Sequence, residues 1–286
     1  MIKFENVSKT YDKKNTENSK FVLNNLNLTI DDGEFVFVMG ESGAGKTTLT
    51  KLLLREERVT SGKLYVDNYR LDKIPPRKVP YLRRNMGVVF QDFRLFENKT
   101  VFENVAFAME ILGEPKSAIR KKVPITLEIV GLKGKENVMP AKLSGGEKQR
   151  LCVARAIVNN PSVIIADEPT GNLHTSLAKD IMDLLVKISQ FGKTVIVVTH
   201  AEELVKLYDK RIIKIENGVL SSDSKYPVKN TGTETVVCES DVNIDGEIKN
   251  SEFAKPGSDA EEAVHMTYTD FSSEDSDTKE DTEVNA

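Results

Sequence analysis

The chain has 286 residues, of which 39% are hydrophobic and 29% are charged. This is the composition of a globular protein with one large domain or two small ones. No apolar run approaches the roughly 18 residues that a membrane span needs, and the N-terminus lacks the apolar stretch of a secretory signal. We therefore expect neither a membrane-spanning nor a secreted protein. The two cysteines, Cys152 and Cys238, form no disulfide framework and favour a reducing cytosol.

Charge divides the chain into two regions. Residues 221–286 carry 17 acidic and 5 basic side chains, a net charge of −12, whereas residues 1–220 carry 27 acidic and 35 basic side chains, a net charge of +8. The second region buries too little apolar surface to offset the entropy of folding. We predict a domain over 1–220 and a flexible acidic tail over 221–286. The basic balance of the domain fits an anionic membrane surface, or equally a set of scattered solvated lysines.

The first half of the chain predicts strands and then helices. Ile2–Val7 and the run that starts at Phe21 suggest antiparallel strands around a polar loop. Phe35–Met39 is a short apolar run that ends in glycine, which is typical of a buried strand. From Thr100 to Lys142 the pattern is mostly helical.

The second half predicts a strand–helix–strand unit. Val163–Ala166 and Thr194–Val198 are again typical of buried strands. Apolar residues recur between them at helical spacing: Leu177, Ile181, Leu184, Leu185 and Ile188. This order predicts parallel pairing with a right-handed connection, and therefore an α/β fold.

The strand at Phe35 leads into a segment that fits the P-loop pattern G-x-x-x-x-G-K-[ST]. We expect these residues to bind the phosphates of ATP: Gly40, Glu41, Ser42, Gly43, Ala44, Gly45, Lys46, Thr47 and Thr48. Glycines let backbone N–H groups approach phosphate oxygens, and the following helix directs its positive end at the same place. Lys46 is expected to reach the β- and γ-phosphates and Thr47 to bind Mg²⁺. A plain glycine turn before a helix is the less favoured alternative.

Two adjacent acids, Asp167 and Glu168, follow the predicted strand Val163–Ala166. Ligands of parallel sheets bind at the carboxyl ends of strands. Beside a P-loop, we expect Asp167 to hold Mg²⁺ and Glu168 to act as the general base on an attacking water. Taken alone, the pair would be no more than a solvated turn.

Between these two motifs, Leu143–Arg150 reads LSGGEKQR and resembles the signature of ABC ATPases. Its Ser144, Gly145 and Gly146 open a predicted helix and would offer a hydroxyl and backbone N–H groups to a γ-phosphate. The same residues also fit a capped helix, with Ser144 as N-cap and Glu147 completing a capping box. Both interpretations use the same geometry and are compatible.

The resemblance to ABC ATPases covers Met1 to about Leu220, and three further positions match the family. Tyr11 stands where the family has an adenine-stacking aromatic, Gln91 where it has the glutamine that senses the γ-phosphate and Mg²⁺, and His200 where it has the histidine that contacts the γ-phosphate. The family fold is a P-loop NTPase: a RecA-like α/β core with an antiparallel β subdomain and a helical signature subdomain. We therefore expect an ATPase with ATP and Mg²⁺ as cofactors and Lys46, Gln91, Glu168 and His200 as catalytic residues.

Family members sandwich two ATP molecules in a dimer, between the P-loop of one subunit and the signature of the other. The resemblance therefore implies a homodimer. One position departs from the family: His174 stands where an aspartate is usual, in a loop at the dimer interface. Because a histidine donates where a carboxylate accepts, we expect altered coupling between the two sites.

Within the ABC ATPases, residues 87–108 and Thr170–Leu173 resemble the FtsE family of bacterial cell-division ATPases. That resemblance implies an FtsX-like integral membrane partner and mechanical signalling to cell-wall hydrolases. The alternative is the ATPase of a lipoprotein-releasing or macrolide-export transporter.

The FtsE resemblance also implies a place in the cell and a docking surface. We expect a peripheral protein on the cytoplasmic face of the membrane, at the division septum, with no nucleic acid partner. Docking is expected in a groove beside Gln91, with four apolar anchors: Phe93, Leu95, Phe96 and Phe102. The alternative is that these side chains fill the core of the helical subdomain. The acidic tail is either a spacer, which is the favoured interpretation, or a docking arm for a division protein.

Overall fold

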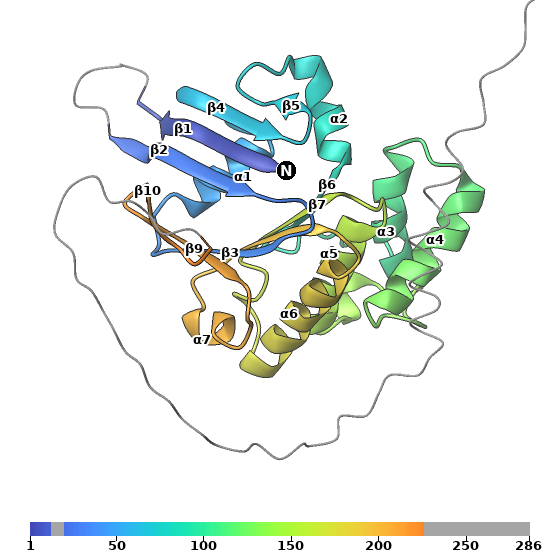
Figure 1. Cartoon of the computed structure of the whole chain (residues 1–286). Helices are drawn as coiled ribbons and strands as arrows, with labels where there is room; N and C mark the ends of the chain where they lie inside the picture. The colour runs from blue at the N-terminus through green and yellow to red at the C-terminus, as the bar shows by residue number, and fades with distance from the viewer. Residues whose placement is uncertain (13–19, 226–286) are drawn as a thin grey trace, which may run out of the picture. The chain divides into compact units, whose positions relative to one another are not determined.

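The computed structural model describes residues 1–12 and 20–225 of the chain (Figure 1). The chain divides into two compact units, Met1–Pro227 and Val228–Ala286. The second unit lies outside the described residues, and so does most of the predicted acidic tail.

The first of two sheets is formed by the N-terminal part of the chain. It contains β1 (Ile2–Thr10), β2 (Phe21–Ile30), β4 (Ser61–Val66) and β5 (Tyr69–Arg70) in the order β2-β1-β4-β5. All of its neighbours pair antiparallel. The antiparallel strands expected near the N-terminus are therefore confirmed.

The second sheet has six strands in the order β10-β9-β3-β8-β7-β6. Its strands are β3 (Phe35–Met39), β6 (Met86–Val89), β7 (Val163–Asp167), β8 (Thr194–Val198), β9 (Arg211–Glu216) and β10 (Val219–Asp223). The pairs β9–β3, β3–β8, β8–β7 and β7–β6 are parallel, and only β10 runs antiparallel to its neighbour. The predicted parallel strand–helix–strand unit is confirmed as β7, α6 and β8.

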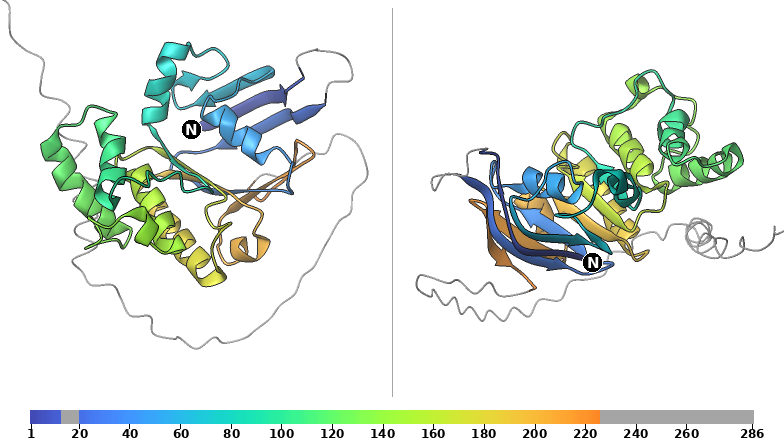
Figure 2. Two further views of the ribbon diagram at one scale, coloured as in Figure 1. Left: turned by 180° about the vertical axis from the view of Figure 1, so that it is seen from behind. Right: turned by 90° about the horizontal axis from the view of Figure 1, so that it is seen from above.

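Helices separate the strands, and those that follow β6 gather on one side of the second sheet (Figures 1 and 2). The helices are α1 (Lys46–Leu53), η1 (Pro76–Lys78), α2 (Val79–Arg84), α3 (Val101–Glu110), α4 (Lys116–Ile129), η2 (Pro140–Lys142), α5 (Gly145–Ile157), α6 (Thr175–Ser189) and α7 (Glu202–Val205). The helical region expected between 100 and 142 corresponds to α3, α4 and η2. Within residues 1–12 and 20–225, no helix combines the length and apolarity that crossing a membrane requires.

Two hydrophobic cores lie on opposite faces of the second sheet. The side chains of β3 alternate between them: Phe35, Phe37 and Met39 face α3–α6, whereas Val36 and Val38 face α1 and the first sheet. Strands β7 and β8 alternate in the same way. Burial on both faces explains why these strands are continuous apolar runs in the sequence.

The C-terminal boundary of the folded unit differs from the predicted one. Strand β10 crosses residue 220 and carries Asp223, which accepts two hydrogen bonds from Arg211, at 2.9 Å from Nε and 2.6 Å from Nη2. The two side chains are 5% and 3% exposed. Arg211 also contacts Glu34, at 2.9 Å. Because these buried charges belong to the sheet, the boundary at 220 is too early, and the fold continues at least to Lys225.

This buried ion pair gives a test of the revised boundary. Asp223→Ala leaves the buried guanidinium of Arg211 without its bidentate partner, and we expect the free energy of unfolding to fall by about 3 kcal/mol. Urea denaturation measures the change. Ser222→Ala, at an exposed position of the same strand, is the control and should stay within about 0.5 kcal/mol of the parent. Equal losses in the two variants would contradict a structural role for the pair.

Candidate functional site

The predicted site residues follow the carboxyl ends of four neighbouring strands. Strand β3 leads into the P-loop at Gly40, β8 into His200, β7 into Glu168 and β6 into Gln91. Because β3, β8, β7 and β6 are adjacent and parallel, their carboxyl ends meet at one edge of the sheet. This is the edge at which open α/β sheets bind ligands.

The P-loop needs glycine at two positions because the backbone packs closely. A Cβ atom on Gly40 would lie 2.2 Å from the Ile215 carbonyl oxygen. Gly45, at φ +106°, precedes α1, and a Cβ atom there would lie 2.7 Å from the Val22 carbonyl oxygen. The loop is therefore held against two strands, and its backbone N–H groups lie at the start of α1, where an anion is favoured.

Lys46 is the first residue of α1 and is only 8% exposed. Its Nζ donates hydrogen bonds to the carbonyl oxygens of Gly40 (2.7 Å) and Glu41 (2.9 Å). The ammonium group thus points back into the loop, where it could donate hydrogen bonds to phosphate oxygens. Thr47, the next residue, is exposed.

Asp167 lies beside the P-loop helix. The Thr50 hydroxyl is 3.4 Å from Oδ2 of Asp167. Burial raises the pKa of the Asp167 carboxyl above its usual range, and the negative charge of Glu168 adds to this effect, while Thr50 and Lys46 oppose it. A cation bound at this point would therefore stabilise the ionised form of Asp167.

The oxygen donors at this point fit Mg²⁺. Mg²⁺ is usually bound through one or two protein oxygens, water and substrate phosphates rather than by a complete protein cage. Asp167 supplies a carboxylate and Thr47 an exposed hydroxyl. In the described part of the chain there is no group of three or more His, Cys, Asp or Glu side chains that could bind a metal by itself.

Glu168 is held in an unusual backbone conformation and contacts His200. Its φ is +48°, its N–H donates to Val198 O at 2.8 Å, and its own carbonyl accepts from the N–H of Gly171 at 3.2 Å. Its Oε1 lies 2.8 Å from Nδ1 of His200. A carboxylate can only accept, so Nδ1 carries the proton when Glu168 is ionised. Strained backbone held by neighbours is typical of functional positions.

Gln91 is exposed and lies beside the segment that follows Glu168. The Nδ2 atom of Asn172 donates to the Gln91 carbonyl oxygen at 3.3 Å. A Cβ atom on Gly171 would lie 3.3 Å from Nε2 of Gln91. The structure therefore brings Gln91, Asp167, Glu168 and His200 together at the sheet edge that carries the P-loop.

Tyr11 lies beside the P-loop helix α1 and is 49% exposed. Its hydroxyl is 3.4 Å from the Thr48 hydroxyl. The Lys9 ammonium lies 4.7 Å from the centre of the tyrosine ring and forms an ion pair with Glu57 at 2.8 Å. The sequence analysis missed Lys9 and Glu57, because nothing in the sequence pairs residues 48 positions apart.

The signature residues lie at the start of α5, apart from the P-loop. Ser144 is the N-cap of α5 and forms a capping box with Glu147, so the predicted cap is confirmed. A Cβ atom on Gly145 would lie 3.5 Å from Leu173, just before α6, and one on Gly146 would lie 3.2 Å from Leu177, within α6. Among the described residues, no hydrogen bond or ion pair joins these three positions to the P-loop.

His174 is the N-cap residue of α6 and is exposed. Its side chain makes no capping hydrogen bond. An aspartate at this position would accept a hydrogen bond from the first turn of the helix, which a histidine here does not.

A second connection that the sequence analysis missed joins α5 to the turn after Gln91. Arg155 donates hydrogen bonds to the carbonyl oxygens of Phe93 (2.8 Å) and Arg94, and Cys152 Sγ lies 3.1 Å from the same Phe93 oxygen. Phe93 and Arg94 both have positive φ, at +40° and +50°. Burial raises the pKa of the Cys152 thiol to about 12, so this cysteine is a structural contact rather than a reactive thiolate.

Sequence comparison finds clear relatives. The family model described as ABC transporter matches residues 23–171. The cell division ATP-binding protein FtsE of Bacillus subtilis (strain 168) is 47% identical over 223 residues, which cover 78% of this chain and 96% of that protein. FtsE of Escherichia coli (strain K12) is 40% identical over 220 residues, which cover 77% of this chain and 97% of that protein.

Solved structures agree with the sequence comparison. The dimeric structure of MJ0796, a bacterial ABC transporter cassette, is 37% identical, has a TM-score of 0.69 and covers 78% of this chain and 98% of that chain. A dimeric post-hydrolysis state of MJ0796 bound to ADP and Pi is 35% identical, has a TM-score of 0.68 and covers the same shares of the two chains. The chain therefore belongs to the ABC transporter family and is one of its ATPases, with FtsE proteins among its relatives.

Proposed function

We propose that this ATPase drives an FtsX-like membrane protein in bacterial cell division, from a peripheral position on the cytoplasmic face of the membrane. The observation that carries the proposal is the 47% identity to a cell division ATP-binding protein over 96% of that protein's length. The meeting of the P-loop, Gln91, Glu168 and His200 at one sheet edge supports it. The less favoured alternative, a tail that docks a division protein, concerns a segment that lies almost wholly outside the described residues.

The geometry supports a division of roles in hydrolysis. Lys46 and the P-loop N–H groups bind the phosphates, and the half-exposed ring of Tyr11 stacks on the adenine. Thr47, Gln91 and Asp167 would hold Mg²⁺, which neutralises charge on the phosphates. Glu168 accepts a proton from the attacking water, while the Nδ1–H of His200 orients its carboxylate.

A second copy of the chain would complete each site. Ser144, Gly145 and Gly146 lie at the start of α5, where the backbone N–H groups of the first turn have no partner within the helix. Such a helix start favours an anion. Because these residues make no hydrogen bond to their own P-loop among the described residues, we propose that they bind the γ-phosphate held by a partner subunit. The dimeric form of MJ0796 supports this arrangement.

The membrane partner is proposed to dock in a groove of about 460 Å³ between α2, β6, α3 and α5. Ile111, at the end of α3, lines the groove and is 64% exposed. Arg155 lines the same groove and holds the turn after Gln91. A shift of Gln91 on ATP binding would therefore reach the groove through Arg155.

The four apolar residues expected to anchor the partner lie elsewhere. Phe93, Leu95 and Phe102 are half-buried and pack against the core that contains α3–α6. The ring of Phe96 packs edge-on against Phe107, with ring centres 4.6 Å apart. These side chains contribute to the helical subdomain, so Ile111 is the better anchor to test.

Ile111→Ser tests the docking groove. Because Ile111 is 64% exposed, the change should shift the free energy of unfolding by less than about 0.5 kcal/mol and leave ATPase activity near that of the parent. We expect it to abolish co-purification with the FtsX-like partner. Leu207→Ser is the control, since Leu207 is 63% exposed outside the groove. Co-purification of the partner with the Ile111→Ser variant would contradict docking at this groove.

His174→Asp tests the atypical interface position. An aspartate would cap α6 and should raise the free energy of unfolding by about 1 kcal/mol, which corresponds to an increase in melting temperature of roughly 2–4 °C. The melting temperature is measured without nucleotide, so that only the helix cap contributes. His174→Ala supplies no acceptor and should give no increase. If both variants have the same melting temperature, the missing cap does not affect the stability of the helix.

A further inference from the structure

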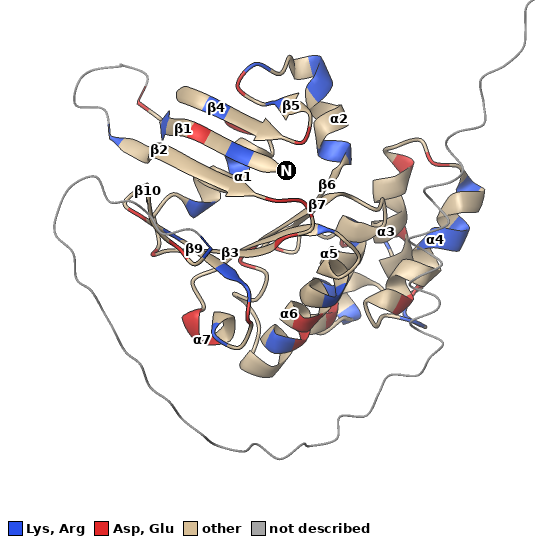
Figure 3. Ribbon diagram, in the orientation of Figure 1, with Lys and Arg blue, Asp and Glu red and all other residues tan. Residues whose placement is uncertain are grey.

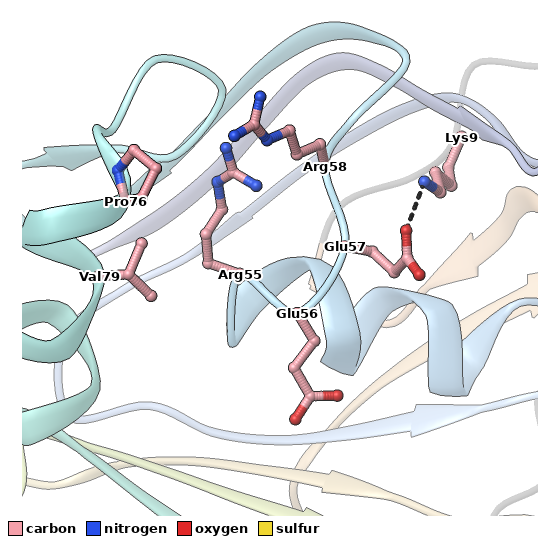
Figure 4. A pocket seen from close by; sticks show the side chains of 7 residues that line it. All are labelled: Lys9, Arg55, Glu56, Glu57, Arg58, Pro76 and Val79. Atoms are coloured by element: carbon pink, nitrogen blue, oxygen red, sulfur yellow. Dashed lines mark hydrogen bonds and ion pairs between the residues drawn. The ribbon is translucent and has the colours of Figure 1, made fainter.

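A second cavity lies beyond the carboxyl end of α1, away from the P-loop. Its volume is about 540 Å³, and its lining includes Arg55 and Arg58 from the segment after α1, Lys9 from β1, and Pro76 and Val79 from η1 and α2 (Figure 4). None of the predicted ATP-binding residues lines it. Lys9 joins the two regions, since its ammonium group also lies 4.7 Å from the centre of the Tyr11 ring, but Arg55 and Arg58 lie outside the predicted nucleotide site.

Two guanidinium groups converge in this cavity. Figure 4 shows the ends of Arg55 and Arg58 side by side. Nε of Arg55 donates to the Leu71 carbonyl oxygen at 2.8 Å, which fixes the side chain and leaves its terminal nitrogens toward the cavity. Burial, followed by the nearby charge of Arg58, lowers the pKa of Arg55. Arg58 is exposed, so its guanidinium group can turn toward a ligand, and two like charges this close favour an anion between them.

The acids around the cavity do not neutralise this pair. Glu57 is paired with Lys9 at 2.8 Å. Glu56 points away from the two guanidinium groups (Figure 4). Among residues 1–12 and 20–225, no ion pair joins a carboxylate to Arg55 or Arg58. Asp72 lies close enough to favour the charged form of Arg55, but its carboxylate is paired with Arg70 at 3.0 Å. Positive charge therefore predominates where the two guanidinium groups meet.

Capping of α1 does not account for the two arginines. The Leu54 carbonyl oxygen accepts from Nε of Arg83 at 2.9 Å. The Lys51 carbonyl oxygen accepts from the N–H groups of Glu56 (2.9 Å) and Glu57 (3.2 Å). Since other donors serve the carboxyl end of the helix, the terminal nitrogens of Arg55 and Arg58 are available to a ligand.

The backbone at Arg55 is also strained. Its φ is +56°, directly after Leu54, the C-cap of α1. Glycine is the usual residue in this left-handed position, and a larger side chain there costs on the order of 1 kcal/mol. The conformation belongs to the helix end itself, because the N–H groups of Arg55 and Glu56 donate to the carbonyl oxygens of Leu52 (3.0 Å) and Lys51 (2.9 Å). The guanidinium group of Arg55 is directed into the cavity from this helix end (Figure 4).

We propose that this cavity binds a phosphate group between the guanidinium groups of Arg55 and Arg58. Planar guanidinium groups match the oxygens of a phosphate, and a tetrahedral phosphate presents enough oxygens for both. Arg77 and Lys78 of η1 are exposed between the lining residues Pro76 and Val79, and basic residues continue along α2 (Figure 3). The phosphate belongs either to an anionic phospholipid headgroup or to a soluble anion.

Two binding measurements on the full chain distinguish these sources. Both are made with the nucleotide site saturated by Mg²⁺ and a non-hydrolysable ATP analogue, because the P-loop also binds phosphate. Titration calorimetry with inorganic phosphate measures the soluble ligand. Sedimentation with vesicles of phosphatidylglycerol, compared with vesicles of phosphatidylcholine, measures the headgroup.

The variant Arg55→Gln/Arg58→Gln removes both guanidinium groups, and Arg120→Gln/Lys121→Gln removes two exposed charges from α4 as a control. Arg58→Gln alone keeps the Arg55–Leu71 hydrogen bond and serves if the double variant fails to fold. Unchanged basal ATPase activity shows that each variant is folded.

We expect at least a tenfold loss of phosphate affinity, or of binding to phosphatidylglycerol vesicles, in the Arg55/Arg58 variants and little loss in the control. A loss of binding to vesicles alone identifies a lipid headgroup, and a loss of affinity for inorganic phosphate identifies a soluble ligand. The proposal is wrong if the parent protein binds neither probe, or if the Arg55/Arg58 variants and the control bind equally.

Discussion

The order of four parallel strands is the constraint on which the rest of the structure depends. Strands β3, β8, β7 and β6 lie next to one another, so four segments that are far apart in the sequence end at one edge. Each strand ends next to one component of the proposed phosphate site: the P-loop, His200, Glu168 or Gln91. The two cores on either side of the sheet keep these strands in register. Apolar packing therefore fixes the relative positions of the site residues.

Most of the fold could be predicted from the sequence because its strands are buried on both faces. Phe35–Met39 and Thr194–Val198 are observed with the predicted bounds, since a continuous apolar run has only one way to be buried between two layers. The P-loop could also be predicted, because local backbone geometry requires its glycines. Strand β10 could not be predicted, because its last three residues are polar and the ion pair between Asp223 and Arg211 anchors it.

The predictions failed wherever an interaction joins distant segments through single side chains. The hydrogen bonds from Arg155 to the turn at Phe93 span 62 positions and leave no periodic pattern. The anchors expected beside Gln91 illustrate a different difficulty, because aromatic residues after a strand fit a core as well as a groove. Phe93, Leu95 and Phe102 pack against the core, and their role in docking stays a prediction. These connections matter for function, because Arg155 links the turn after Gln91 to helix α5, whose start carries the signature. Under the proposed function, Arg155 would pass a movement of this turn to the groove in which the partner is proposed to dock.

The assignment of Glu168 as the general base is the central claim, because it turns the geometry of one sheet edge into ATP hydrolysis. Steady-state turnover and ATP affinity of Glu168→Gln test it most directly, with Glu203→Gln, an exposed acid on α7, as the control. An amide keeps the shape of the side chain but cannot accept the proton, so turnover should fall by about 10²–10⁴-fold while ATP affinity stays within a few-fold of the parent. Turnover at the parental rate in Glu168→Gln would contradict the account.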